Sequence, residues 1–105
     1  MTLEQLLAEK YRECMPLFIA LGDEVRLNII SLLYANQPNG LNVNEITSRT
    51  SLSRPAISHH LKILKDAGMV NVHRIGTSNF YYLTSLESTR KLMELGALVE
   101  QSYQE

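Results

Sequence analysis

Apolar residues between positions 42 and 83 recur first with a helical period and then, after Gly68, with a period of two. This change constrains the fold more than any other feature of the sequence. Two helical segments precede it, separated by a short turn at positions 51–53, and residues 70–83 then alternate as a β-hairpin with a polar tip. The chain must therefore place two helices and a hairpin in direct succession.

Both helical segments carry their own start signals. Asn42 and Glu45 have the spacing of a capping box, and the short helix that they open is expected to end near Thr50. Ser53 caps the second helix, whose Pro55 lies in the first turn, where a missing backbone N–H costs little. A helix, a tight turn, a second helix and a hairpin in this order predict a winged helix-turn-helix.

The second helix has one apolar and one polar face. Its buried face is expected to consist of Ile57, Leu61 and Leu64. At about 100° per residue, the outer face then holds Pro55, His59, Lys62 and Asp66, with Arg54 and Ser58 beside them. No acidic residue lies between Ser51 and Lys65, whereas a solvated helix face typically alternates Glu and Lys. The pattern favours contact with a polyanion.

These outer side chains suit the base edges and phosphates of duplex DNA. Arg54 can donate two hydrogen bonds to guanine O6 and N7, and backbone N–H groups at the same helix end can hold a phosphate. The hairpin tip offers a second contact, to the adjacent minor groove or its phosphates. The predicted DNA-binding set is Ser53, Arg54, Pro55, Ser58, His59 and Lys62 on the helix, and Arg74, Thr77, Ser78 and Asn79 on the hairpin.

The formal net charge of −1 hides a strong asymmetry along the chain. Residues 1–45 carry three basic and six acidic side chains, a balance of −3, and residues 84–105 carry two and four, a balance of −2. Residues 46–83 carry five basic side chains and one acidic, a balance of +4, and hold all three histidines. A basic middle segment gives one part of the surface the positive field that DNA binding requires.

Two segments before the basic region are predicted to be helical. Thr2 and Gln5 form a capping box for a first helix with apolar residues at helical spacing. Pro16 is expected to bend or end that helix, with a short apolar turn over residues 17–21. Asp23 caps the next helix, in which apolar residues occupy nearly the whole circumference, as in a core helix.

Thr84 and Glu87 form a further capping box, which opens a last helix that is apolar on one side. The apolar stripes on the first and last helices exceed what a winged core of roughly 70 residues can cover, so a second copy is expected to cover them. Such a twofold dimer selects a near-palindromic site. The sequence thus predicts one mainly α domain with a small β-hairpin over residues 1–105, with the helix-turn-helix at about 42–67, the wing at about 70–83 and dimerisation helices at about 3–15 and 85–103.

A chain of 105 residues with 45% hydrophobic and 20% charged residues has the length and composition of one globular domain. No apolar run approaches the roughly 18 residues of a membrane span, and the first residues lack the layout of a signal peptide, so a cytoplasmic protein is expected. The single Cys14 excludes an internal disulfide. It is expected to be buried, although a disulfide or a thiolate pair between two copies stays open.

Three segments resemble the ArsR/SmtB repressors, a family of bacterial transcriptional regulators. They are residues 21–33, 52–70 and 74–83, within a match from about Leu17 to Leu83. The most specific part is Ser58-His59, followed by Leu61 and the Lys-Asp-Ala-Gly segment at 65–68. The resemblance implies that the positions of Arg54, Ser58 and His59 face an operator, that the wing tip contacts DNA, and that the terminal helices pair two protomers of a repressor.

The metal ligands that this family often carries are missing. A thiolate site would need cysteines where Asn42-Val-Asn44 stand, and residues 86–105 contain neither histidine nor aspartate. Adjacent His59 and His60 diverge on a helix and cannot hold one ion together, and we interpret His60 and His73 as packing residues. We therefore expect no cofactor and no metal, and hypothesise control by an unidentified non-metal effector, a partner or expression level.

Two other classes of function compete with DNA binding. Winged helices also serve as protein-docking modules with no DNA role, and this alternative stays open. An enzyme has little support, because the sequence shows no nucleophile–base set, glycine-rich phosphate loop or paired carboxylate site. The sequence therefore favours a DNA-binding regulator.

Overall fold

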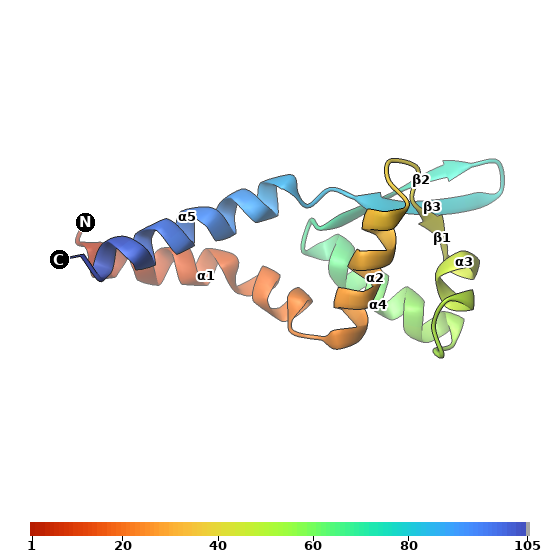
Figure 1. Cartoon of the computed structure of the whole chain (residues 1–105), viewed down its shortest axis with the longest axis horizontal. Helices are drawn as coiled ribbons and strands as arrows, with labels where there is room; N and C mark the ends of the chain where they lie inside the picture. The colour runs from red at the N-terminus through yellow and green to blue at the C-terminus, as the bar shows by residue number, and fades with distance from the viewer. Residues whose placement is uncertain (105) are drawn as a thin grey trace.

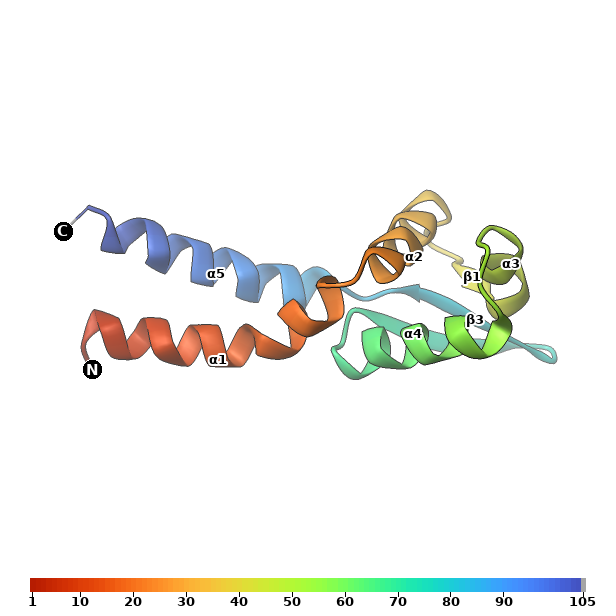
Figure 2. The same ribbon diagram turned by 90° about the horizontal axis from the view of Figure 1, so that it is seen from below.

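The computed structural model describes residues 1–104 as a small winged core with a helical arm. The elements are α1 (Leu3–Leu21), α2 (Glu24–Ala35), β1 (Leu41–Asn42), α3 (Val43–Ser48), α4 (Arg54–Asp66), β2 (Val70–Ile75), β3 (Ser78–Leu83) and α5 (Leu86–Ser102). Helices α1 and α5 lie side by side and project from the core as the α1–α5 arm, with both chain ends at its far end (Figure 1; Figure 2). The molecule measures 53 × 23 × 20 Å. The predicted fold class, mainly α with a β-hairpin wing, is confirmed.

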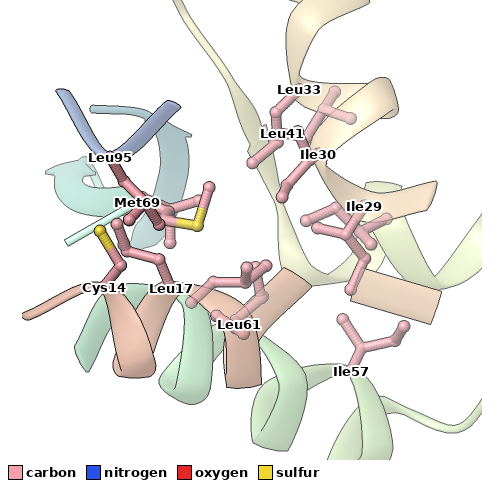
Figure 3. Packing of buried hydrophobic residues seen from close by; sticks show 14 residues of the cluster. Cys14, Leu17, Ile29, Ile30, Leu33, Leu41, Ile57, Leu61, Met69 and Leu95 are labelled. Atoms are coloured by element: carbon pink, nitrogen blue, oxygen red, sulfur yellow. The ribbon is translucent and has the colours of Figure 1, made fainter. Parts of the chain in front are cut away.

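The core is built on the inner face of α4. Ile57, Leu61 and Leu64 have no exposed surface, as predicted, and they belong to one apolar cluster with Ile29 and Leu33 of α2 (Figure 3). Full burial of each such side chain contributes roughly 1.5–3 kcal/mol. This row therefore fixes which face of α4 points inward and leaves the opposite face to solvent.

Buried and polar contacts join the two helices of the arm. Cys14 of α1 is fully buried, as predicted, and its Sγ donates to the Lys91 carbonyl of α5 at 3.7 Å. Lys10 Nζ donates to the Glu94 carboxylate at 2.6 Å, and this hydrogen bond raises the pKa of Lys10 and lowers the pKa of Glu94.

No helix among residues 1–104 combines the length and apolar character needed to cross a bilayer.

The sheet has three antiparallel strands in the order β1-β3-β2, one strand more than the predicted hairpin. The additional strand β1 pairs Leu41 with Tyr81, on the side of β3 opposite to β2. Gly40 precedes it with a φ of +79°, and a Cβ at this position would lie 1.9 Å from the Tyr81 carbonyl oxygen. Only glycine therefore allows the chain to approach β3 closely enough to add this strand.

Most predicted helix starts are confirmed. Side chains of Thr2 and Asn42 accept hydrogen bonds within complete capping boxes, and Asp23 and Ser53 cap α2 and α4. The prediction that α2 is buried nearly all round is wrong in part, because Leu27 is 46% exposed. Helix α2 is thus a surface helix with one strongly buried side.

Of the two effects predicted for Pro16, a bend or an end of the first helix, the second is wrong. Helix α1 continues through Pro16 to Leu21 as one element, so the apolar turn expected over residues 17–21 is helical. A proline in a helix interior removes one backbone hydrogen bond. Leu17 and Ala20 continue the helical spacing and are buried in the core, and their burial offsets that loss.

The capping box predicted at Thr84 and Glu87 is also wrong. Helix α5 begins at Leu86, and its N-cap residue Ser85 makes no capping hydrogen bond through its side chain. The Thr84 hydroxyl donates instead to the Gly68 carbonyl at 3.1 Å. This residue therefore ties the end of the wing to the end of α4.

Replacing Leu61 with alanine is expected to lower the free energy of unfolding by about 2–5 kcal/mol, because the truncation leaves a cavity in the core. Urea denaturation followed by circular dichroism measures the change. Lys65→Ala, at an exposed position of the same helix, is the control and should change the free energy by less than about 0.5 kcal/mol. Equal losses in the two variants would contradict the packing described.

Candidate nucleic-acid interface

Helix α4 brings the six predicted helix residues together on its solvent side and at its start. Ser53, Arg54, Pro55, Ser58, His59 and Lys62 are all exposed. The first turn of the helix contains no acidic residue. The exposed part of α4 therefore offers hydrogen-bond donors and positive charge, without a carboxylate near its N-terminus.

Ser53 and Pro55 shape the start of this helix. The Ser53 hydroxyl accepts a hydrogen bond from the Ala56 N–H at 3.3 Å, which satisfies one of the free donors of the first turn. Pro55 lies in that first turn, where its fixed φ suits the helix. Because Pro55 has no N–H and the N–H groups of Ala56 and Ile57 both donate to Ser53, Arg54 is the residue of this turn whose backbone N–H can bind an anion.

The wing forms the second part of the interface. Strands β2 and β3 place Arg74 opposite Asn79, and the turn between them contains Gly76 and Thr77. Arg74, Thr77 and Asn79 are exposed, and Ser78 is half-buried. Arg74 Nε donates to the Gly76 carbonyl at 3.0 Å, which holds the base of the guanidinium against the turn.

The start of α4 and the tip of the wing lie at the same end of the molecule, away from the α1–α5 arm (Figure 2). In Figure 1, α3 lies between them. The four predicted wing residues and the six helix residues thus form two separate groups on one end of the protein. Such an arrangement matches a helix in one groove and a wing over the adjacent groove.

One charged pair on α4 was not foreseen. Lys62 Nζ lies 2.9 Å from Asp66 Oδ2, and the two side chains are 74% and 64% exposed. The spacing of four residues signals this pair in the sequence. Because Asp66 competes with any phosphate for Lys62, part of the positive charge of this face is masked.

Arg49 is a further exposed basic residue near α4 that was not among the candidates predicted from the sequence. Arg49 is the C-cap residue of α3, at the beginning of the turn that leads to α4, and its side chain is exposed. Together with Ser51 it borders a cavity of about 480 Å³ between this turn and α2. Its position in the turn of a helix-turn-helix was the available signal, since the first helix of such a motif crosses the DNA backbone.

The histidines have different surroundings. His59 is exposed on the outer face of α4, whereas His60 is half-buried and contacts Arg26. His73 of the wing packs between the rings of Phe80 and Tyr82, at centroid distances of 6.3 and 5.0 Å. Within residues 1–104, no three His, Cys, Asp or Glu side chains are grouped so that they could hold a metal ion.

Comparison with known proteins identifies the family. The family described as bacterial regulatory proteins of the arsR family matches residues 23–72. An uncharacterised HTH-type transcriptional regulator of Methanocaldococcus jannaschii is 44% identical over 75 residues, which are 71% of this chain and 82% of the relative. The chain belongs to the ArsR family. The transcriptional repressor SdpR of Bacillus subtilis is 35% identical to this ArsR protein over 68 residues, 65% of the chain and 72% of SdpR.

A solved structure of a transcriptional regulator has the same fold. Reduced HlyU from Vibrio cholerae is 33% identical to this ArsR protein, with a TM-score of 0.69 over 90% of the chain and 96% of HlyU. HlyU is named a transcriptional activator. The protein is thus a DNA-binding transcriptional regulator with a winged helix-turn-helix fold, and it is not an enzyme, as the sequence predicted.

Substituting Asp66 by asparagine is expected to strengthen binding to random-sequence duplex DNA, because Lys62 then loses its competing carboxylate. The slope of log affinity against log salt should steepen by about one unit, as for one added phosphate contact. Fluorescence anisotropy between about 50 and 200 mM salt measures both quantities.

The matched control is Glu4→Gln, which removes an exposed carboxylate from the start of α1, in the arm. An unchanged affinity for Asp66→Asn, or the same gain in both variants, would speak against a role of Lys62 at the interface.

Proposed function

We propose that this regulator represses transcription in the cytoplasm by binding a near-palindromic operator as a homodimer. The observation that carries the proposal is the exposed N-terminal half of α4, which is free of acidic residues and shares one end of the molecule with the wing. An inert packing helix has no reason to keep such a face, because alternating Glu and Lys would stabilise it better.

The proposed contacts follow from side-chain chemistry. Arg54 donates to the O6 and N7 atoms of a guanine, and Ser58 and His59 bond bases or phosphates in the same major groove. Lys62 contacts a phosphate, and so does Arg49, whose exposed position in the turn before α4 supports this contact. The wing residues, Arg74, Thr77, Ser78 and Asn79, contact the adjacent minor groove or its phosphates, and Ser53 and Pro55 shape the helix that carries the other contacts.

The homodimer is supported by apolar surface that the α1–α5 pair does not cover. Tyr11, Met15 and Phe18 follow each other at helical spacing along α1 and are 48%, 52% and 37% exposed. Met93 adds a 68% exposed apolar side chain on α5. A second copy that packs its own arm against this stripe removes it from water and fixes two recognition helices relative to each other.

Repression is proposed by analogy with SdpR, whose name describes a repressor, while HlyU is named an activator. A promoter assay, with an operator selected from a random duplex library, distinguishes repression from activation. For the signal we propose a non-metal effector, because the Asn42 side chain, where a thiolate ligand would stand, caps α3 by accepting from the Glu45 N–H at 2.8 Å.

Replacing Arg54 with alanine is expected to weaken binding to an operator selected from a random duplex library by about 1–3 kcal/mol, because a bidentate base contact is lost. The free energy of unfolding should change by less than about 0.5 kcal/mol, since Arg54 is exposed. Fluorescence anisotropy and urea denaturation measure the two quantities.

Arg90→Ala removes an exposed arginine of α5, outside the interface, and serves as the control. If the domain were a protein-docking module without a DNA role, DNA affinity would be weak and insensitive to both substitutions. Equal losses for Arg54→Ala and Arg90→Ala would indicate only unspecific charge attraction.

Met15→Glu is expected to weaken self-association by roughly 100-fold, because it places a carboxylate in the proposed apolar interface, at a cost of about 3 kcal/mol. Sedimentation equilibrium measures the dissociation constant. Ser31→Glu, which adds the same charge on an exposed position of α2, should leave it unchanged. A wild-type protein that stays monomeric at operator-binding concentrations would refute the dimer.

A further inference from the structure

The side chain of Arg26 connects three helices beneath the DNA-binding face. It originates on α2, is only 9% exposed, and makes three hydrogen bonds of 2.7 to 3.1 Å through its guanidinium. Partly buried arginines are uncommon and need their donors satisfied. The partners of Arg26 lie on α1 and α4, so they show what this side chain holds together.

Two of the hydrogen bonds close the end of α1. Arg26 Nε donates to the Ala20 carbonyl at 2.7 Å, and its NH2 group donates to the Ile19 carbonyl at 3.0 Å. Both carbonyls belong to the last turn of α1, where no further helical N–H groups are available to them. A cation at this end of a helix is also favoured by the helix dipole.

The third hydrogen bond reaches the recognition helix. Arg26 NH1 lies 3.1 Å from Nδ1 of His60 on α4. A guanidinium only donates, so Nδ1 of His60 is the acceptor in this hydrogen bond. His60 directly follows the proposed DNA contact His59, and the two imidazole rings lie 5.7 Å apart in an edge-to-face arrangement.

Asp23 holds the other side of the guanidinium. It caps α2 by accepting from the Arg26 N–H at 3.1 Å, and its second carboxylate oxygen lies 4.0 Å from Arg26 NH1. The backbone hydrogen bond from Arg26 lowers the pKa of Asp23, and the charge of Arg26 lowers it further. The Asp23 carboxylate and the carbonyls of Ile19 and Ala20 therefore fix the orientation in which the Arg26 guanidinium donates to His60.

This arrangement has a consequence for a dimer. Helix α1 belongs to the arm, and α4 carries the proposed base contacts, so any rotation between them changes the distance between the two recognition helices. The buried row of α4 resists sliding, but apolar contacts are not directional. A hydrogen bond to a fixed guanidinium is directional.

We propose that the Arg26–His60 hydrogen bond is a positioning contact, which orients α4 relative to the α1–α5 arm and thereby sets the half-site spacing that the dimer accepts. The inference rests on the proposed binding of a homodimer to a two-part operator. It makes His60 a determinant of the half-site spacing, although this residue is not among the proposed DNA contacts.

The test uses the full chain and a series of duplexes derived from its selected operator, in which the two half-sites are moved apart or together by one or two base pairs. A duplex with one half-site serves as the reference. The wild-type protein should prefer its own spacing by roughly tenfold or more over the shifted duplexes, as expected when one half-site loses its contacts.

His60→Leu removes the acceptor and keeps an apolar side chain in its place. We expect its preference among spacings to fall to about twofold, while its affinity for the single half-site stays within about twofold of the wild type. His60→Asn is the matched variant, because its amide oxygen is the same number of bonds from the backbone as Nδ1 and can accept from Arg26. It should restore the wild-type preference.

A uniform loss of affinity for every duplex, including the single half-site, would show a merely structural role and overturn the proposal. So would a His60→Leu protein with full spacing preference, or a His60→Asn protein that behaves like His60→Leu. Should His60→Leu fail to fold, His60→Ala takes its place in the same comparison.

Dimeric operator binding and the positioning contact are refuted by different results. A wild-type protein that binds all spacings equally contradicts dimeric operator binding itself, whereas a wild-type preference that survives the loss of His60 contradicts only the positioning contact.

Discussion

The row of Ile57, Leu61 and Leu64 holds the molecule together, because it binds α4 to the core along one face only. These three side chains have no exposed surface, and the opposite face of this 13-residue helix remains open to solvent. The position of α4 also determines where the wing begins. The chain leaves the helix through Gly68, which has a φ of +77°, and the next residue, Met69, is buried in the same core. Shifting the row by one residue would move the DNA contacts and the wing together.

The local parts of this structure could be predicted from the sequence because their causes are local. A capping side chain lies within three residues of the N–H that it accepts from, as at Asn42 and Ser53. The inner and outer faces of α4 follow from helical spacing, and the hairpin follows from alternation and its turn. All ten predicted contact residues consequently lie on the start of α4, its outer face or the wing, although their contact with DNA is a proposal.

The parts that could not be predicted depend on neighbours far away in sequence. Pro16 stays within α1 because the turns on both sides of it are packed, which no local rule reveals. The strand β1 exists only because β3 lies beside it, almost 40 residues later. Arg26 and His60 are 34 residues apart, and Lys10 and Glu94 are 84 apart, so neither pair has a local sequence signature.

Because the molecule is elongated, a small rotation about the joint at Arg26, where α1, α2 and α4 meet, produces a large displacement at the ends of the molecule. The arm and the wing tip occupy opposite ends of a molecule 53 Å long (Figure 2), and Arg26 connects the end of α1, in the arm, with α4. With a lever of about half that length, a rotation of roughly 7° displaces the tip by about 3.4 Å, the rise of one base pair. A slender protein of this kind therefore converts sub-ångström adjustments near its pivot into whole steps along a double helix, which a spherical domain of equal mass could not do.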